Sequence, residues 1–322
     1  MHRFHRRSCA PGSPSGRATW YRIPTAVGLL LFLFVVGAGW TQGVVGQDRP
    51  VPTGAAVTLL DRGFRFTEGP VWFEDGLLFS DIPANTVYRW TPDQGTRVFL
   101  NPSGRANGLA VDPSGRLVLA QHKGQIGRTT ETGSVTSVVR TYGGRRLNSP
   151  NDLTVASDGT IYFTDPPYGV DKGERRLSFS GVYRLSPNGS LTLLTKQFAR
   201  PNGIDLSPDD STLYVSDSRE TTVWAFDVTG TGDIRNGRSF AAPTDADADG
   251  TTDGLTVDAN GNVYTTGPGG VWIYAPDGTR LARIAVPKPP TNLAFGGPEG
   301  RTLFITARAH VYRIEVNAEG AR

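Results

Sequence analysis

The sequence contains almost no cysteine. Cys9 is the only one among 322 residues, and it lies in the N-terminal segment that we expect to be separate from the folded domain. A domain without thiols has no disulfide, no thiolate metal site and no cysteine nucleophile. Serine does not take over that role, because no serine lies in the strand-to-helix elbow that Ser-His-Asp hydrolases use. Covalent catalysis of either kind therefore has no support.

An excess of basic charge is also absent once the N-terminus is set aside. Met1–Arg22 carries five of the 33 basic residues and none of the 30 acidic ones, so the remainder has 28 against 30, a net charge of −2. The high isoelectric point therefore belongs to the leader. It gives no reason to expect a nucleic-acid partner.

Only one long apolar run is present. Ile23–Val45 carries no charge and follows the basic segment, which is the order of an export signal. Val44–Gly46 offers a small-residue cleavage site, and the alternative is an uncleaved anchor, since the run is just long enough to span a bilayer. We expect residues 1–46 to be an export signal or membrane anchor and residues 47–322 to be exported, to the periplasm or beyond the cell. The membrane is a partner only if this segment is retained.

The remainder contains a sixfold repeat. A Glu, Asn or Asp opens a short apolar strand, and a Gly or Asp follows eight residues later, at intervals of 39 to 51 residues. The six openers are Glu68, Asn107, Asn151, Asn202, Asp253 and Asn292. Repeats of this period indicate a propeller or a solenoid.

Each repeat reads as four strands, with a second run such as Leu77–Ser80 or Ile161–Thr164 and a third such as Val182–Leu185. We read Tyr168–Phe179 and Gly230–Thr252 as loops. The sixth repeat lacks its fourth strand, and an unassigned apolar run, Val57–Leu60, precedes the first. The sequence therefore predicts an all-β, six-bladed β-propeller closed by an N-terminal strand.

If the ring closes, the openers converge at one mouth. Glu68, Asn151, Asn202 and Asp253 would form an oxygen-only set of two carboxylates and two amides, which suits Ca²⁺ first and Mg²⁺ second and argues against zinc or copper. Because antiparallel second strands end on the same side, further groups are expected to flank this mouth: Asp81, His122, Asp165, Asp217 and Arg308. Carboxylates crowded there would raise each other's pKa unless a cation neutralised them.

A simpler interpretation is turn formation. Asn-Gly and Asp-Gly pairs favour turns with positive φ, so Asn107-Gly108, Asn202-Gly203 and Asp253-Gly254 are open to that alternative. Glu68 is not, because glutamate is a poor turn residue. The half-complete calcium-loop pattern at Asp245–Asp249 has Thr256 where the closing glutamate belongs; it is read as a solvated acidic loop, with a second cation as the alternative.

Five segments resemble the gluconolactonase and regucalcin (senescence marker protein) family: Phe66–Trp72, Asn148–Leu153, Ile161–Gly169, Arg200–Gly203 and Thr291–Gly297. The resemblance runs from about Val57 to the C-terminus. It implies a six-bladed propeller with one divalent cation, usually Ca²⁺, with Mg²⁺, Mn²⁺ or Zn²⁺ possible in its place. The implied metal ligands are Glu68, Asn151, Asn202 and Asp253, and Asp253 would also be the catalytic acid or base.

The resulting expectation is a metal-dependent hydrolase of sugar lactones. The cation would polarise the lactone carbonyl while Asp253 takes a proton from the attacking water. Substrate contacts are expected from Asn107, His122, Asn151 and Tyr168, although His122 also fits a hydrogen-bonded histidine at a strand end. The alternatives are a phosphotriesterase on the same site and a non-catalytic propeller that binds a protein or glycan. The oligomeric state is not predicted.

Overall fold

The computed structural model describes residues 49–171 and 173–321, and its regular structure in these ranges is entirely β-strand. The predicted export segment, residues 1–46, lies outside the described residues. None of the described segments is a helix able to cross a membrane.

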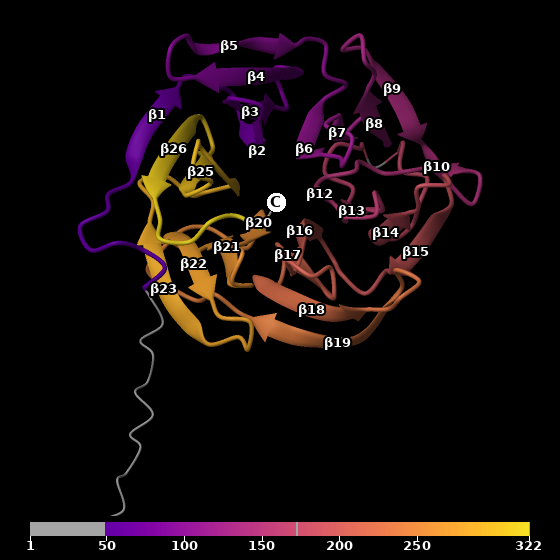
Figure 1. The fold of residues 1–322 in the computed structure, drawn as a ribbon. Coiled ribbons are helices and arrows are strands. Elements are labelled where there is room, and N and C mark those ends of the chain that lie inside the picture. The colour runs from indigo at the N-terminus through magenta and orange to yellow at the C-terminus, as the bar shows by residue number, and fades with distance from the viewer. Residues whose placement is uncertain (1–48, 172, 322) are drawn as a thin grey trace, which may run out of the picture. The chain divides into compact units, whose positions relative to one another are not determined.

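Six four-stranded antiparallel sheets stand around a central axis, which is the predicted six-bladed propeller (Figure 1). Blades 1 to 3 consist of β2 (Thr67–Phe73), β3 (Gly76–Asp81), β4 (Thr86–Thr91) and β5 (Gly95–Leu100); β6 (Ala106–Val111), β7 (Leu117–Gln121), β8 (Gln125–Thr129) and β9 (Val135–Val139); and β12 (Leu153–Val155), β13 (Ile161–Asp165), β14 (Gly181–Leu185) and β15 (Leu191–Thr195). Blades 4 to 6 consist of β16 (Pro201–Leu206), β17 (Thr212–Asp217), β18 (Thr222–Val228) and β19 (Ile234–Ala241); β20 (Leu255–Val257), β21 (Val263–Gly267), β22 (Gly270–Tyr274) and β23 (Arg280–Ala285); and β24 (Asn292–Gly296), β25 (Thr302–Ala307), β26 (His310–Glu315) and β1 (Thr58–Arg62).

The N-terminal strand closes the ring, as expected. β1 pairs antiparallel with β26, from Thr58 opposite Arg313 to Arg62 opposite His310. This pairing covers the backbone edge that β26 would otherwise expose. The last blade is thereby built from both ends of the propeller.

One predicted loop is wrong. Gly230–Thr252 contains β19, the outer strand of blade 4, whose sequence IRNGRSFA has few apolar residues. An outer strand is largely solvated, so it needs no alternating apolar pattern to pair with β18. The described residues of Tyr168–Phe179 form no strand, as expected, and a short hairpin of β10 (Thr141–Tyr142) and β11 (Arg145–Arg146) follows blade 2 in the chain.

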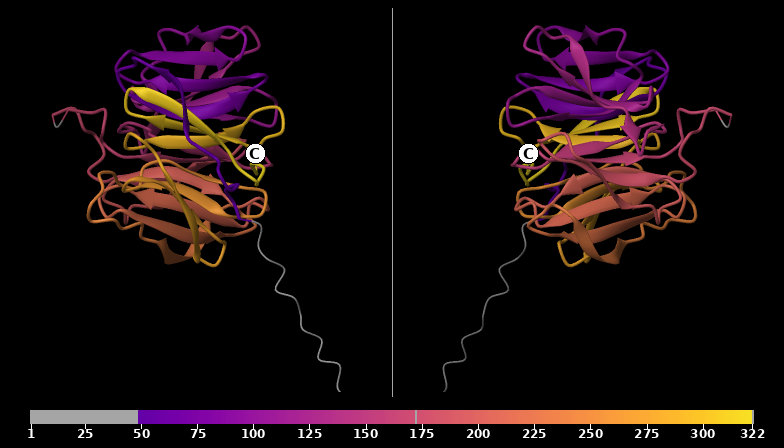
Figure 2. Two further views of the ribbon diagram at one scale, coloured as in Figure 1. Left: turned by 90° about the vertical axis from the view of Figure 1, so that its left-hand side faces the viewer. Right: turned by 90° about the vertical axis from the view of Figure 1, so that its right-hand side faces the viewer.

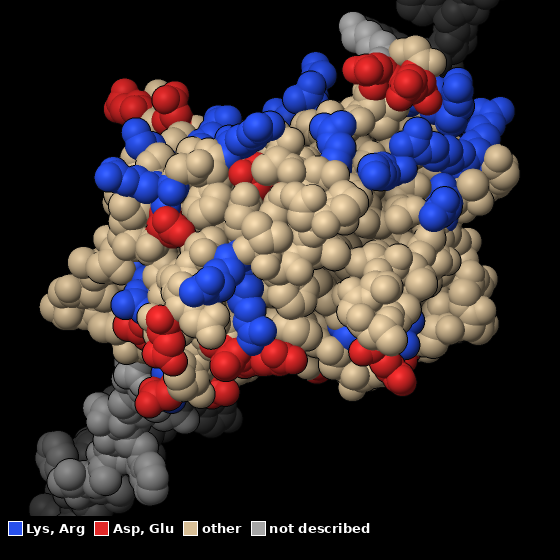
Figure 3. Space-filling model, turned by 90° about the horizontal axis from the view of Figure 1, so that it is seen from above, with Lys and Arg blue, Asp and Glu red and all other residues tan. Residues whose placement is uncertain are grey.

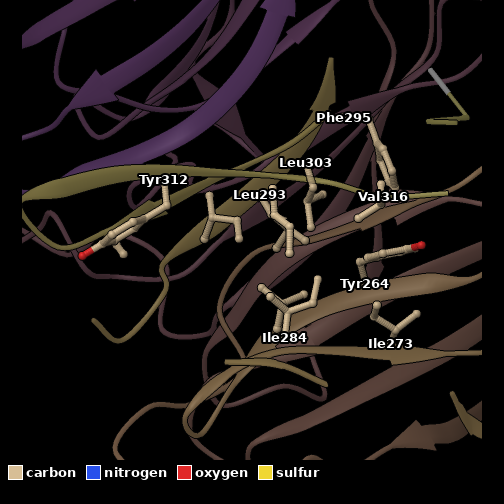
Figure 4. Packing of buried hydrophobic residues seen from close by; sticks show 12 residues of the cluster. Tyr264, Ile273, Ile284, Leu293, Phe295, Leu303, Tyr312 and Val316 are labelled. Carbon is tan, nitrogen blue, oxygen red and sulfur yellow. The ribbon is translucent and has the colours of Figure 1, made fainter. Parts of the chain in front are cut away.

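The hydrophobic core lies between neighbouring blades. In one cluster, Tyr264, Ile273 and Ile284 of blade 5 pack against Leu293 and Leu303 of blade 6 (Figure 4). Each sheet thus buries both faces against its neighbours. Packing of this kind holds the inner strands at fixed positions around the axis.

Glycines allow the inner strands of adjacent blades to touch. The Gly203 N–H donates to Asp253 O at 2.9 Å, and a Cβ on Gly203 would lie 2.5 Å from that oxygen. Likewise the Gly108 N–H donates to Asn151 O at 2.7 Å, and a Cβ there would lie 2.4 Å from Asp152 Oδ1. Gly108 and Gly203 are therefore required because a larger residue would prevent the close approach of neighbouring inner strands.

This observation overturns the turn alternative. Asn107-Gly108 and Asn202-Gly203 lie inside β6 and β16, and Asp253-Gly254 directly precedes β20. None of Asn107, Asn202 and Asp253, nor the glycine that follows each, has the positive φ that such a turn needs. These pairs place side chains at the axis.

Replacing Gly203 by alanine should therefore lower the free energy of unfolding by about 3 kcal/mol, because the new methyl group collides with backbone that has no room to move. Urea denaturation of the variant and the wild type measures the difference. Gly230→Ala is the matched control, since a Cβ there meets nothing within 4 Å, and its stability should change by less than about 0.5 kcal/mol. Equal stability of the two variants would contradict the close approach.

Candidate functional site

Three openers, Asn107, Asn202 and Asp253, are each held by a hydroxyl of the blade before them. Thr164 Oγ1, on β13, donates to Asn202 O at 2.7 Å, and Ser216 Oγ, on β17, donates to Asp253 O at 2.6 Å. A hydroxyl on a second strand thus holds the carbonyl of the next opener. These hydrogen bonds tie the inner strands of neighbouring blades to each other.

The ladder between the first and second strands is irregular at three of the openers. The register shifts between Glu68 and Val71, between Ala106 and Leu109, and between Pro201 and Ile204. Bulges of this kind redirect a side chain relative to the pleat. They explain how openers inside a strand turn toward the axis.

Glu68 and Asp253 form the acidic centre of the mouth. Glu68 is 3% exposed, and its pKa is raised well above the usual value by burial, then by the negative charges of Asp253 and Asp152. Burial and the charge of Asp152 raise the pKa of Asp253 to about 7, while Arg308 and a hydrogen bond from Asn202 lower it. Asp253 keeps partial contact with solvent at the mouth. Whichever of the two carboxyls ionises first opposes ionisation of the other.

Asp152 is a site residue that the sequence prediction did not assign. It is 6% exposed, accepts a hydrogen bond from Asn292 Nδ2 at 3.2 Å, and has its pKa raised by burial to about 7. In four repeats the residue after the opener is glycine, whereas blade 3 has Asp152. That exception in the repeat was the available signal.

The two amide candidates are also at the mouth. Asn151 and Asn202 are 4% and 5% exposed. Asn202 Nδ2 donates to Ser218 Oγ at 2.9 Å, and the same side chain hydrogen-bonds Asp253. Asn202 therefore links the acidic centre to Ser218.

The donor set fits a hard cation. The described residues contain no group of three His, Cys, Asp or Glu side chains arranged for a metal, so any cation here needs amide oxygens as well. Glu68 and Asp253 supply two carboxylates whose ionisation is opposed only until a positive charge is placed between them. Two carboxylates with amide oxygens from Asn151 and Asn202 match the preference of Ca²⁺ or Mg²⁺.

Asn107 and His122 form a pair beside this centre. Asn107 Nδ2 and His122 Nε2 are 3.1 Å apart. Burial, followed by the charge of Arg105, lowers the pKa of His122 to about 4, so its ring is neutral at pH 7 and Nε2 accepts from the amide. Asn107 Oδ1 is buried and accepts no hydrogen bond from the described residues. This oxygen is available to a ligand donor.

Tyr168 lies at the rim of the mouth. Its side chain is 40% exposed, the Arg200 guanidinium lies 5.5 Å from its ring centroid, and its hydroxyl donates to Ser218 Oγ at 3.0 Å. The substrate contact predicted for Tyr168 stays a prediction. The hydroxyl already has a partner in the protein.

Three of the acids expected to flank the mouth have a structural role instead. Asp217 Oδ2 accepts the Ala199 N–H at 2.8 Å, and Asp165 Oδ2 accepts the Asn148 N–H at 2.8 Å. Asp81 does the same for the segment before β2, where the Arg65 N–H lies 2.8 Å from its Oδ2. These carboxylates accept hydrogen bonds from backbone amides that precede the inner strands. Their positions at strand ends in the sequence did not predict this role.

The Asp245–Asp249 loop shows no metal arrangement. Asp245 Oδ2 lies 2.5 Å from Arg283 Nη1 and its Oδ1 accepts the Asp247 N–H. An acid paired with arginine and a backbone amide matches the solvated-loop interpretation. The second cation remains a prediction without structural support.

Two surface features complete the description. Seen from the side of blades 1 and 2, Lys and Arg are most numerous in the upper half of the view, while Asp and Glu lie along the lower margin and at both upper corners (Figure 3). A cavity of about 360 Å³, lined by Asp152, Asp205 and Thr256 among others, approaches the openers. Neither Glu68 nor Asp253 lines it, so it is distinct from the mouth.

Known proteins are similar to this chain in sequence and in fold. The gluconolactonase of Zymomonas mobilis is 37% identical over an alignment of 306 positions, and the alignment covers 85% of each chain. The solved structure of a gluconolactonase from Xanthomonas campestris is 34% identical, with a TM-score of 0.76, over 83% of this chain and 91% of that one. A regucalcin structure from Agrobacterium tumefaciens, described as a calcium-binding protein, has a TM-score of 0.69 over 83% of this chain and 95% of that one, and its 22% identity shows the fold alone.

The family model described as the SMP-30/gluconolactonase/LRE-like region matches residues 66–309. This range contains every opener and the paired carboxyls Glu68 and Asp253. The chain therefore belongs to the SMP-30/gluconolactonase/LRE-like family.

Proposed function

We propose that this protein hydrolyses sugar lactones with the help of a divalent cation, Ca²⁺ foremost. The observation that carries the proposal is the pair of Glu68 and Asp253 at one mouth of a propeller whose relatives include gluconolactonases. A propeller that served only as a scaffold would have no use for two carboxyls that oppose each other's ionisation.

Glu68, Asn151, Asn202 and Asp253 would hold the cation. When bound, it supplies a positive charge that polarises the lactone carbonyl and stabilises the oxyanion. The protein's own contribution is to hold these oxygens at fixed positions, through the interblade hydrogen bonds to Asn202 O and Asp253 O. Fixed positions avoid a cost of reorganisation during the reaction.

Asp253 is the better general base of the two candidates. It is ionised when the cation is bound, because the positive charge lowers the pKa that burial raises, and its partial exposure admits the attacking water. The pKa of His122 is about 4, which makes its neutral ring a weak base at pH 7. His122 therefore fits orientation of the substrate instead.

Asn107 is suited to a sugar hydroxyl. Its Oδ1 is buried and lacks a partner among the described residues, and an unsatisfied buried acceptor costs about 1–3 kcal/mol. A hydroxyl donated by the substrate would satisfy it. His122 would hold the same amide in place through Nε2.

We also propose, from the basic and apolar order of residues 1–46, that the protein is exported to the periplasm or beyond, and that it is retained at the membrane if that segment is not cleaved. An exported lactonase would act on lactones formed outside the cytoplasm. Detection of the protein in periplasmic or culture fractions checks this.

Hydrolysis of glucono-1,5-lactone, followed with a pH indicator, tests the function. Turnover should fall by at least about 100-fold with a chelator, recover with CaCl₂, and fall similarly in Asp253→Asn because the base is lost. Full activity with the chelator present would contradict the cation requirement. Phosphotriester hydrolysis without lactone hydrolysis would favour the first alternative, and no turnover of either would favour the scaffold.

A further inference from the structure

The loop after β13 begins beside the mouth. It projects from one face of the propeller (Figure 2), and its first residues are fixed at several points. The Gly169 N–H donates to Ser149 Oγ at 2.9 Å, and a Cβ on Gly169 would lie 2.8 Å from the His122 ring. Tyr168 is therefore held between blade 2 and blade 4.

From this position Tyr168 interacts with Asn202, a residue of the candidate cation site, both directly and through Ser218. The Tyr168 hydroxyl donates to Ser218 Oγ at 3.0 Å, and Asn202 Nδ2 donates to the same oxygen at 2.9 Å. Ser218, just after β17, is itself anchored because Thr251 Oγ1 donates to Ser218 O at 2.6 Å. Ser218 Oγ thus accepts two hydrogen bonds at a fixed point.

This arrangement fixes the orientation of the Asn202 amide. The nitrogen of an amide is a donor only, and the oxygen is the only atom of the group that can bind a hard cation. Nitrogen and oxygen are attached to the same carbon, so an acceptor that holds the nitrogen also sets the direction of the oxygen. The nitrogen therefore has two acceptors, Ser218 Oγ and the Asp253 carboxylate, and removal of Ser218 Oγ would free the amide to rotate about the bond that carries it.

We propose that Tyr168 and Ser218 are positioning residues for the cation site, acting through Asn202. The inference rests on the proposed function, because it assumes that Asn202 is a cation ligand. It assigns Tyr168 a role different from the direct substrate contact expected from the sequence. Residues that orient a metal ligand typically contribute 10–100-fold to metal affinity.

Calcium titration calorimetry of the cation-free protein tests this. We expect Ser218→Ala to raise the Kd for Ca²⁺ by about 10-fold or more, and Tyr168→Phe by a smaller factor, because Ser218 remains in the second variant. Ser218→Thr keeps the acceptor oxygen and should restore the Kd to within about 3-fold of the wild type. The melting temperature of the cation-free variants, measured in parallel, separates affinity from stability.

Tyr162→Phe is the matched control. Its hydroxyl also makes one hydrogen bond, to Gly232 O at 3.0 Å, but away from the mouth. This variant should bind Ca²⁺ with the wild-type Kd. If Ser218→Ala does not fold, Tyr168→Phe against Tyr162→Phe decides the question.

The two possible failures are distinguishable. A wild type that binds no divalent cation overturns the proposed function and this inference together. A wild type that binds Ca²⁺ while Ser218→Ala and Tyr168→Phe bind it equally well overturns the inference and leaves the proposed function standing. A change in melting temperature with an unchanged Kd would likewise assign both residues a purely structural role.

Discussion

Replacing Glu68 by glutamine is expected to abolish lactone hydrolysis and, at the same time, to stabilise the cation-free protein. The glutamine is nearly the same size but carries no charge, so the repulsion among Glu68, Asp253 and Asp152 is reduced. We expect the free energy of unfolding of the cation-free protein to rise by about 1–3 kcal/mol at pH 8, because a desolvated charge is removed while the side-chain volume is kept. We expect kcat/KM to fall by about 1,000-fold or more, because the cation that would stabilise the oxyanion is lost together with its ligand.

Calcium-dependent melting gives the second measurement. A ligand at 100 times its Kd stabilises the folded state by about 2.7 kcal/mol, and in Glu68→Gln that increment should disappear. Glu74→Gln is the matched control, since Glu74 follows β2 on the same segment but its side chain is 64% exposed and pairs with Arg89. It should keep both turnover and the calcium increment. A calcium increment of wild-type size in Glu68→Gln would remove Glu68 from the ligand set.

The fold was predictable because each repeat contains short apolar strands at similar positions. The second strands such as β3 and β25 are buried along their full length, so most of their residues are apolar or small. β19 has no such restriction, because an outer strand exposes most of its residues. β19 forms because its backbone pairs with the free edge of β18. Backbone pairing of this kind leaves no pattern of apolar residues in the sequence.

The site was predictable where symmetry decided it, and not where a single contact did. Glu68 and Asp253 are brought together by ring closure, which the repeat period alone implies. Asp165 and Asp217 end their strands in the same way as a mouth residue would, yet they turn back to cap backbone amides. Ser218 is one polar residue among many after a strand, and only the folded position of Tyr168 gives it a role.

The affinity for calcium should depend steeply on pH. Asp253 titrates with a pKa of about 7 in the cation-free protein, and the pKa of Glu68 is also raised, so protons compete with the cation at neutral pH. Below pH 7 the Kd for Ca²⁺ should rise by about 10-fold per pH unit for each proton displaced. Calorimetry at pH 6, 7 and 8 measures it. The same Kd at pH 6 and pH 8 would show that the two carboxyls are not the ligands.

The stability of the cation-free protein should change with pH in the opposite sense. A carboxyl whose pKa is higher in the folded state binds more protons there, so stability is lost as the pH rises from about 4 to about 7. For a fully desolvated carboxyl such as Asp152, whose pKa rises from 3.8 to about 7, the loss is on the order of 4 kcal/mol, and it is smaller for Asp253, which retains contact with solvent. Melting temperatures at pH 5 and pH 8 measure the change, and saturating Ca²⁺ should remove the part due to Glu68 and Asp253.

The variant Asp165→Asn distinguishes the pH dependence that comes from the candidate site from the pH dependence that comes from other buried carboxyls. Asp165 also has a pKa raised by burial to about 7, but it accepts the Asn148 N–H outside the site, and asparagine retains an acceptor for that bond. The variant should therefore show a weaker pH dependence of melting in the cation-free state. Its calcium affinity should keep the wild-type pH dependence, because the protons that compete with the cation belong to Glu68 and Asp253. If Asp165→Asn flattened the pH dependence of calcium binding, the competing proton would have to be assigned to the amide-capping carboxyl, and the mouth would lose its role as the cation site.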